Sequence, residues 1–483
     1  MTEARDDVEN VPAEVQQERA GPAKHALGAW LPVIIILLVA AGARRYSIDR
    51  ESYWIDEFYT LETSAGNGLA HEDIPVNQWL NLPPPSTTDV ATGGGFAGIV
   101  RHAPFDTQAP LYFMMLNVWR RLFGSSEAAV RGLSAVCSIA AVPAIGWLLH
   151  VLTAPRRSVI LGMALAAVSG VQIAFAQEAR PYAMALLWVV CAAIALARIE
   201  RAGHSLARGS ALALALLALV LTHYTGAGCA IALLVYAILQ LKGRTRARTL
   251  AAFIIAGLVF AAIWGPIVMR QRTEALDRLV FLKEDSAGHL ARTLDRIICQ
   301  PFLMLMYAPS ISAPPAGWQW VARAFGVVVF AMPVVLMVRR QARWILLPWL
   351  LLVFPIVQSA VTDMLLTRRA LELPRFSFLA SGGAITVTAG LIAWLRPIVL
   401  SWIASVATLG VMAASLILPG ILGRPSPYDR DKPEFRRFAR ELRADAQTGD
   451  ALLVAIPPGQ RWQSGTLLIA LREYAGAWPG QAP

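Results

Sequence analysis

The stretch Leu31-Pro-Val-Ile-Ile-Ile-Leu-Leu-Val-Ala40 is the centre of an apolar block that covers about residues 27–43. A run of roughly 20 apolar residues can cross a bilayer as one helix. Similar blocks recur along the 483 residues, of which 56% are hydrophobic and only 16% are charged. The sequence therefore predicts an all-α, polytopic membrane protein.

Counting these blocks predicts about eleven transmembrane helices, which form one membrane domain over residues 27–419. The polar residues 1–26 have no periodicity and are expected to be a disordered cytoplasmic tail. No small-residue cleavage site follows the first block, so we expect a retained span instead of a signal peptide. The expected spans cover about residues 27–43, 128–152, 158–176, 182–198, 209–223, 227–241, 249–267, 318–338, 344–362, 376–395 and 398–419.

The basic residues lie in short clusters between alternate blocks, and these clusters predict the topology. With the N-terminus in the cytoplasm, every inside loop is basic, as the positive-inside rule requires. This clustering accounts for the net charge of +11 without nucleic acid, because no stripe of arginine and aromatic residues suits base stacking. The predicted inside loops are 155–157, 198–208, 242–248, 339–343 and Arg396.

Three longer segments fall on the predicted outer face: a first loop at 44–127, a second at 268–317 and a C-terminal segment at 420–483. Within the first loop, Pro110–Phe123 is apolar but too short to cross, so we expect an amphipathic helix on the membrane surface. The C-terminal segment has helical periodicity near both ends and a strand-like run at 451–456, which predicts a small α/β cap. This cap is too small for much of a core and is expected to pack against the outer loops.

Charged residues on the outer face form the candidate site. Asp56 and Glu57 are adjacent in Arg50-Glu-Ser-Tyr-Trp-Ile-Asp-Glu-Phe-Tyr-Thr60, among aromatic residues at a membrane edge. Charge at that depth is costly without a partner or a function. The cations nearby could reach headgroups by snorkelling or could grip a lipid-linked phosphate. These outer-face cations are Arg44, Arg45, Arg180, Arg368, Arg369 and Arg375.

The centres of the expected spans contain no Asp, Glu, Lys or Arg. Ion-coupled transporters normally place ionisable groups at mid-membrane, so this pattern favours chemistry at the outer surface. The four cysteines lack metal-ligand spacing, and the consecutive residues His71-Glu-Asp73 do not suit a metal site, so no metal ligand is predicted. A carboxylate pair could still hold a divalent cation, which leaves metal dependence open.

Four motifs, in order over most of residues 30–380, resemble the GT-C superfamily of integral-membrane glycosyltransferases. The most similar branch comprises protein O-mannosyltransferases and the lipid A aminoarabinose transferase. The C-terminal segment from Arg436 to Val454 also resembles the terminal part of that family. The four motifs are Tyr53-Trp-Ile-Asp-Glu57, Gln108-Ala-Pro-Leu-Tyr112, Leu122-Phe-Gly-Ser-Ser-Glu-Ala-Ala-Val-Arg-Gly-Leu-Ser134 and Ala176-Gln-Glu-Ala-Arg-Pro-Tyr182.

The resemblance implies transfer of a sugar from a polyprenyl-phosphate donor to a lipid, glycan or protein acceptor. It places the active site at the periplasmic face of a bacterial inner membrane. Phosphate is a good leaving group, so such a site needs positive charge for the phosphate and one carboxylate for the acceptor proton. A single displacement inverts the anomeric centre. The essential acidic residue of the family matches Asp56.

The other site residues follow from the same resemblance and from the charge pattern. Arg180 is the first choice for the donor phosphate, and Glu57 either contacts substrate or organises the loop by pairing with Arg50. His102 and Asp106 lie where the family has another charged residue, and Asp106 joins the catalytic candidates. Additional phosphate-binding candidates are Arg375, Arg368 and Tyr182; additional pocket candidates are Glu178, Tyr112 and His223.

Alternatives stay open at the level of sequence. Asp56 could cap a helix or bind a cation, Arg180 could pair with Glu178, and His223 could be an interface anchor. The chain could also be a transporter or flippase of a lipid-linked sugar, which would form no glycosidic bond. A third possibility is a glycan polymerase or ligase that uses a diphosphate-linked donor.

Overall fold

The computed structural model describes residues 21–73, 86–278, 283, 288–306, 316–421, 435–445 and 461–475. Within these ranges the chain is helical and forms no strand beyond an isolated bridge between Lys283 and Arg368. The predicted all-α fold is confirmed. The predicted strand at 451–456 lies outside the described residues, so the α/β character of the cap stays a prediction.

Every predicted apolar block is largely helical, and one block is divided by a sharp bend. The block at 158–176 is divided into α7 (Arg156–Val168) and α8 (Gly170–Ala176), which are bent by 53° relative to each other. The other blocks correspond to α2 (Gly21–Arg45), α6 (Glu127–Val151), α9 (Tyr182–Ala202), α10 (Leu206–Thr222), α11 (Gly226–Gln240), α12 (Gly243–Arg278), α14 (Gln319–Val338), α15 (Leu346–Leu366), α17 (Ala380–Trp394) and α18 (Ile398–Ile421).

The chain is a multi-pass membrane protein by the length and composition of these helices. In the described part of the chain, six helices are long and apolar enough to cross a membrane, or seven if α7 and α8 form one span. Helices α10, α11 and α17 are apolar but shorter, at 10–17 residues. The expected number of eleven spans therefore stays a prediction.

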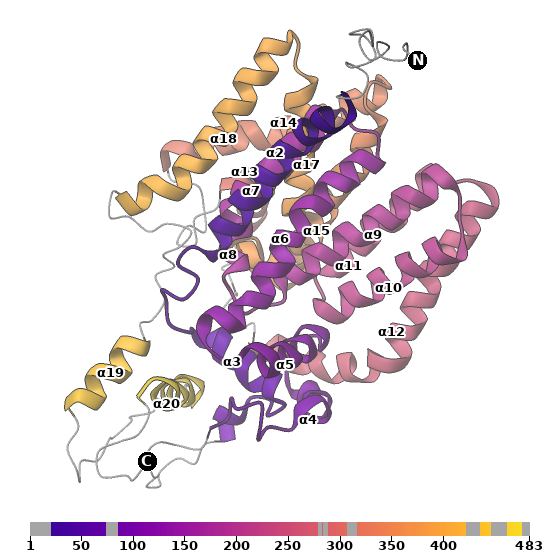
Figure 1. Cartoon of the computed structure of the whole chain (residues 1–483). Coiled ribbons are helices and arrows are strands. Elements are labelled where there is room, and N and C mark those ends of the chain that lie inside the picture. Colours follow the sequence, from indigo (N-terminus) through magenta and orange to yellow (C-terminus); the bar gives the residue numbers. More distant parts are fainter. Residues whose placement is uncertain are drawn as a thin grey trace, which may run out of the picture.

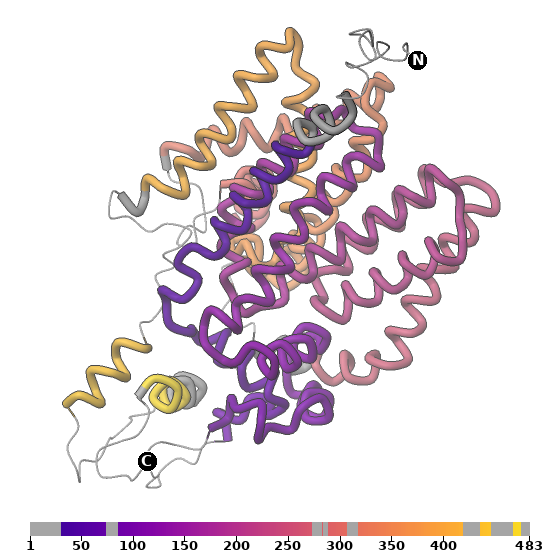
Figure 2. The backbone as a smooth tube through the Cα atoms, in the orientation of Figure 1, coloured from indigo at the N-terminus to yellow at the C-terminus, as the bar shows by residue number. Residues whose placement is uncertain are grey.

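The long helices lie side by side in one bundle, with α9 to α12 at one flank and α14 and α18 at the other (Figures 1 and 2). The first-loop helices α3 (Ile55–Ala65), α4 (Gly95–His102) and α5 (Leu111–Phe123) gather at one end, which we call the site end. The opposite end carries the basic loops 155–157, 198–208, 242–248 and 339–343, and we call it the basic end.

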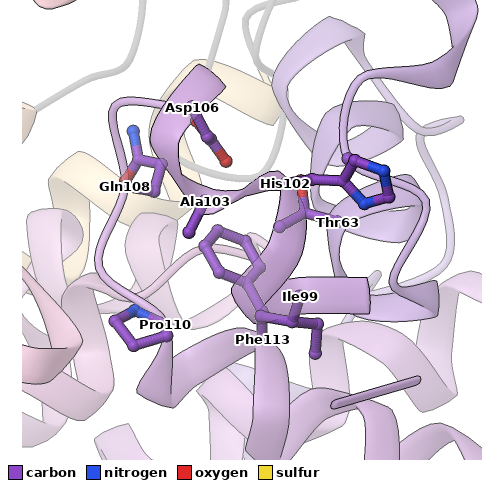
Figure 3. Close-up of a pocket in the computed structure, with 9 residues that line it drawn as sticks. Thr63, Ile99, His102, Ala103, Asp106, Gln108, Pro110 and Phe113 are labelled. Atoms are coloured by element: carbon purple, nitrogen blue, oxygen red, sulfur yellow. The ribbon is translucent and has the colours of Figure 1, made fainter. Parts of the chain in front are cut away.

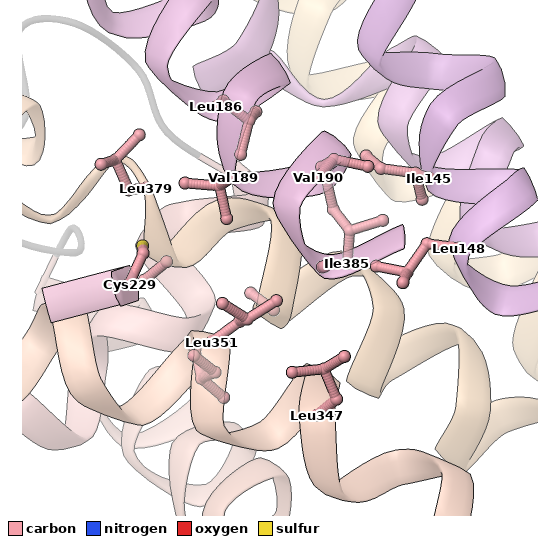
Figure 4. Packing of buried hydrophobic residues seen from close by; sticks show 14 of the residues in the cluster. Ile145, Leu148, Leu186, Val189, Val190, Cys229, Leu347, Leu351, Leu379 and Ile385 are labelled. Atoms are coloured by element: carbon pink, nitrogen blue, oxygen red, sulfur yellow. The ribbon is translucent and has the colours of Figure 1, made fainter. Parts of the chain in front are cut away.

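The core of the bundle is formed by aliphatic side chains from helices far apart in sequence. Figure 4 shows Ile145 of α6, Val189 of α9, Leu351 of α15 and Ile385 of α17 packed together, and all four are at most 3% exposed. Close approach of α15 and α17 depends on Gly383, because a Cβ there would lie 2.4 Å from the backbone nitrogen of Leu352. Such packing gives the site a rigid scaffold.

The predicted amphipathic helix at 110–123 is present as α5, and its place on the membrane surface stays a prediction. Its amphipathic character is visible in the burial: Tyr112 and Leu116 are fully buried, whereas Leu122 is 70% exposed. The helix ends at Gly124, whose φ of 84° favours glycine.

The described C-terminal helices, α19 (Phe435–Asp445) and α20 (Arg461–Ala475), pack against the first loop, as the sequence predicts. The hydroxyl of Tyr474 accepts a hydrogen bond from the backbone nitrogen of Tyr53 at 2.7 Å, and the Tyr474 ring meets Phe58 edge-on at 6.4 Å. Arg436 donates to Glu127 at 2.6 Å. The segment therefore covers α3, the helix that carries Asp56.

The structure corrects one prediction about the outer-face cations, namely that Arg44 is available to a phosphate or a headgroup. Arg44 is fully buried and donates to Ser138 Oγ at 2.7 Å and to the carbonyl oxygens of Ala166 and Ala167 at 2.9 and 3.0 Å. Those carbonyls lie at the bend between α7 and α8, where helical partners are lost. Arg44 is thus buried against the bend instead of facing a phosphate.

Candidate active site

Helix α3 places two carboxylates at its first turn. Acidic residues are favoured there because the N-terminal end of a helix carries partial positive charge. Glu57 also accepts a hydrogen bond from the backbone nitrogen of Trp54 at 3.4 Å, which caps the helix. Residues on successive positions of a helix point in different directions, so Asp56 and Glu57 have different surroundings.

Asp56 lies where three distant segments meet. Its Oδ2 is 3.0 Å from Nη1 of Arg375 and 3.9 Å from Nη2 of Arg180. Arg180 also donates to the Asp56 carbonyl oxygen and to Oγ1 of Thr60, each at 3.2 Å. The structure thus brings together the carboxylate and the two arginines that the sequence singles out, although Asp56 and Arg375 are 319 residues apart.

The two arginines differ in accessibility. The side chain of Arg180 is 8% exposed, whereas Arg375 and Asp56 are 24% and 22% exposed. Burial alone would lower the pKa of Arg180, but the Asp56 carboxylate, together with smaller contributions from Tyr182 and Glu178, more than offsets this and raises that pKa above its ordinary value. The Arg180 guanidinium is therefore positive at the site, and Arg375 is the arginine that an incoming ligand can reach.

Glu57 is fully buried and faces away from solvent. Its Oε1 and Oε2 accept hydrogen bonds from Nε and Nη2 of Arg131 at 2.8 and 2.7 Å, and Oε1 also accepts from the backbone nitrogen of Ala179 at 2.9 Å. The partner is thus Arg131 of α6, instead of the Arg50 that the sequence suggested. Glu57 ties α3 both to α6 and to the turn that carries Arg180.

A wall of aromatic and imidazole rings adjoins the arginines. Tyr182 is 5% exposed; its ring lies 6.0 Å from the guanidinium carbon of Arg180 and 5.2 Å from the ring of His223. His223 Nδ1 accepts from the Thr225 backbone nitrogen at 3.2 Å, so the proton of this neutral imidazole is on Nε2.

Tyr112 and Glu178 support the Arg180 turn. The Tyr112 hydroxyl shares a hydrogen bond of 2.9 Å with Ser134, whose hydroxyl donates to the Arg180 carbonyl oxygen at 3.0 Å. Glu178 is 7% exposed, and its carbonyl oxygen accepts from the Arg180 backbone nitrogen at 2.8 Å. Both residues therefore fix the backbone from which the Arg180 side chain extends.

His102 and Asp106 lie around a cavity of about 10 Å³, enough for roughly one water molecule (Figure 3). His102 Nδ1 lies 3.0 Å from the Gly98 carbonyl oxygen, and Asp106 accepts from the Thr107 backbone nitrogen at 2.6 Å. Thr63, which also lines the cavity, lies two turns along α3 from Asp56, which is roughly 10 Å of helical rise. The structure therefore places these two residues in a neighbouring cavity.

Arg368 belongs to the segment that presents Arg375. It is 4% exposed, and its backbone nitrogen donates to the Asp363 carbonyl oxygen at 3.0 Å. The Asp363 carboxylate in turn accepts from the backbone nitrogens of Ala370 and Leu371 at 2.6 and 3.0 Å. These contacts fix the chain just before α16 (Pro374–Ser377), the short helix that contains Arg375.

Sequence reasoning did not identify Arg131, Thr60 and Asp363 as supporting residues. Arg131 and Asp363 could have been suspected, because each is a charge near the end of an apolar block. Among the residues that the structure describes, no three His, Cys, Asp or Glu side chains come together as a metal site would require.

Comparisons with solved structures identify a known fold. No protein-family model and no curated protein matches the sequence. The oligosaccharyltransferase of Archaeoglobus fulgidus, crystallised with a tethered acceptor peptide, is similar with a TM-score of 0.50 and 12% identity, covering 93% of this chain and 63% of that one. This chain therefore spans less than two thirds of that enzyme's length.

A second solved structure supports the same architecture. ArnT from Cupriavidus metallidurans, in the apo state, is similar with a TM-score of 0.50 and 14% identity, covering 93% of this chain and 78% of that one. At these identities the likeness is one of fold. The chain therefore has the GT-C membrane fold that its motifs predict.

Proposed function

We propose that this protein is a membrane glycosyltransferase that uses a polyprenyl-phosphate sugar as donor. The acceptor is a lipid, glycan or protein, and the reaction takes place at the periplasmic face of a bacterial inner membrane. One observation carries the proposal: a partly exposed carboxylate, Asp56, lies between two arginines at one end of a bundle of apolar helices. Its chemistry suits a membrane-anchored phosphate donor.

In the proposed step, the nucleophilic oxygen or nitrogen of the acceptor forms a bond to the anomeric carbon. The bond from that carbon to the phosphate oxygen breaks, and polyprenyl phosphate leaves with the bonding electron pair. The acceptor proton passes to the Asp56 carboxylate. Because one displacement occurs, the anomeric configuration is inverted.

The arginines have different proposed roles. Arg375 is accessible and contacts Asp56 at 3.0 Å. A donor phosphate can therefore replace Asp56 as the partner of the Arg375 guanidinium, which leaves the carboxylate available to the acceptor. Arg180 is held by Thr60 and by the Asp56 backbone, and it supplies fixed positive charge for the leaving phosphate. The first choice for direct phosphate contact thus moves from Arg180 to Arg375.

The remaining candidates support the step without taking part in it. Glu57 is a positioning residue, because Arg131 and the Ala179 backbone occupy its carboxylate. Tyr182 and the neutral His223 form a wall beside the arginines. The proposed step assigns no proton to His102 or Asp106, which line the neighbouring cavity. Arg368 shapes the segment before Arg375.

The test uses purified protein in vesicles with polyprenyl monophosphate and diphosphate sugars supplied side by side. We expect a new glycosidic bond from the monophosphate donor only, detected by mass spectrometry of lipid and protein acceptors. Donor that crosses the vesicle membrane without a new bond would indicate a flippase. Use of the diphosphate donor alone would indicate a polymerase or ligase.

Replacing Arg375 with Ala is expected to lower kcat/KM for the donor by about 10- to 100-fold, because a hydrogen bond to a charged group contributes about 1.5–3 kcal/mol. The KM for the acceptor should change little. The matched control is Arg323→Ala, which removes a half-exposed arginine from its ion pair with Asp295. Equal loss in both variants, or a change confined to the acceptor KM, would exclude the phosphate contact.

A further inference from the structure

A large opening lies at the basic end of the bundle, remote from Asp56. Its volume is about 510 Å³, in the size range of ligand pockets. It is lined by the start of α7, the end of α14 and the loop after it, the end of α17 and the start of α18. Helix α17 separates it from Arg375, and 15 residues at 1.5 Å per residue make about 22 Å.

The lining of this opening combines cations with aromatic rings. Arg156, Arg157 and Arg396 contribute three guanidinium groups, and no acidic side chain is present among the described residues that line it. Trp344 and Trp394 contribute indole rings. The Trp344 ring lies close enough to α17 that a Cβ at Gly390 would come within 2.5 Å of it.

One wall of the opening continues into a surface suited to hydrocarbon. Ile398 lies at its edge and begins α18, whose apolar span is only 11% buried inside the protein. Along that helix, Val399 is 59% exposed and Trp402 is 60% exposed. Apolar residues exposed on a membrane helix face acyl chains. A ligand could therefore place a charged group among the arginines and a hydrocarbon tail along α18.

We propose that this opening binds an anionic phospholipid of the adjacent leaflet. Arginine grips phosphate through paired hydrogen bonds, and basic pockets between membrane helices suit phosphate headgroups. Tryptophan is favoured at the depth of the headgroups. The exposed apolar face of α18 favours a lipid over a soluble phosphate compound.

The bound lipid connects two helices that lead to the site end. Arg156 and Arg157 begin α7, which continues through α8 to the turn with Arg180. Arg396 follows α17, which begins five residues after Arg375. A headgroup held by all three arginines fixes the basic ends of α7 and α17 relative to each other. Lipid binding should therefore raise the thermal stability of the protein.

The test measures binding in the full-length, delipidated protein, independently of sugar transfer. Phosphatidylglycerol is titrated into the protein, and binding is measured by native mass spectrometry and by thermal unfolding. Diacylglycerol and soluble glycerol phosphate are titrated in parallel for comparison. We expect phosphatidylglycerol to bind and to raise Tm. The triple variant R156Q/R157Q/R396Q should bind it about tenfold to hundredfold more weakly, since each arginine near an anionic headgroup contributes to affinity.

The matched control is R244Q/R246Q/R248Q, which removes the same charge from exposed arginines at the start of α12, also at the basic end. This control should keep wild-type affinity, and both triple variants should keep the wild-type Tm in the absence of lipid. Equal weakening in both variants would mean general electrostatic attraction and overturn the proposal. It is also overturned if diacylglycerol or glycerol phosphate binds as tightly as phosphatidylglycerol.

Discussion

Turnover by the Asp56→Asn variant is expected to fall by about 10²- to 10⁴-fold, the usual contribution of a general base. The amide keeps the size of the side chain and can still accept hydrogen bonds from Arg375 and Arg180, but it cannot take the proton of the acceptor. The donor KM should stay within a few-fold of the wild type. Initial rates of transfer at saturating donor, in vesicles with matched protein amounts, measure this effect.

If Asp56 has only a structural role, we expect little loss of turnover in the Asp56→Asn variant. The N-cap position of α3 is Trp54, so asparagine at position 56 would lose only the interaction of a negative charge with the helix N-terminus, about 0.3–1 kcal/mol, and transfer would stay nearly intact. The matched control is Asp295→Asn, which breaks an aspartate–arginine pair of 2.6 Å at a half-exposed position. This control should transfer sugar at the wild-type rate.

Replacing the acceptor with azide distinguishes a general base from a residue that only positions the arginines. Azide carries no proton to remove, so Asp56→Ala with azide should form glycosyl azide at a rate near that of the wild type with azide. Failure of azide to restore transfer in a stably folded variant would mean that Asp56 holds the arginines in place and is not the base.

The residues of the candidate site could be predicted because they are charged residues next to apolar blocks. Asp56, Arg180 and Arg375 stand out because each is a charge on the predicted outer face, close to the end of an apolar block. Oppositely charged residues in such positions tend to form ion pairs, because unpaired charge at a membrane edge is costly. The motifs carry no distance information, but the predicted topology places all three residues on one face, which limits the partners available to each.

The parts that sequence could not predict depend on contacts across long stretches of chain. The bend at Ser169 is stabilised by Arg44, which reaches the carbonyls of Ala166 and Ala167 from 122 and 123 residues away. Glu57 pairs with Arg131, 74 residues away, although Arg50 is nearer along the chain. Hydropathy likewise predicts where helices form, but it does not distinguish a full span from a short apolar helix such as α17.

The Glu57→Gln variant is expected to lose about 3–5 kcal/mol of unfolding free energy, because it leaves the charge of Arg131 buried without a counter-charge. Arg131 is 3% exposed, and its other partners are the carbonyl oxygens of Ile48, Glu51 and Ser52, which carry no full charge. The measurement is denaturant unfolding in detergent. The double variant Glu57→Leu with Arg131→Met should be less destabilised than Glu57→Gln, because no lone charge stays buried.

The matched control is Glu441→Gln in the exposed pair of Arg437 and Glu441, whose side chains are 72% and 63% exposed. Exposed pairs contribute about 0–1 kcal/mol, so this variant should unfold almost like the wild type. A Glu57→Gln variant that is equally stable but inactive would assign Glu57 to the substrate. Because Glu57 also accepts from the Ala179 backbone beside Arg180, we instead expect stability and transfer to fall together.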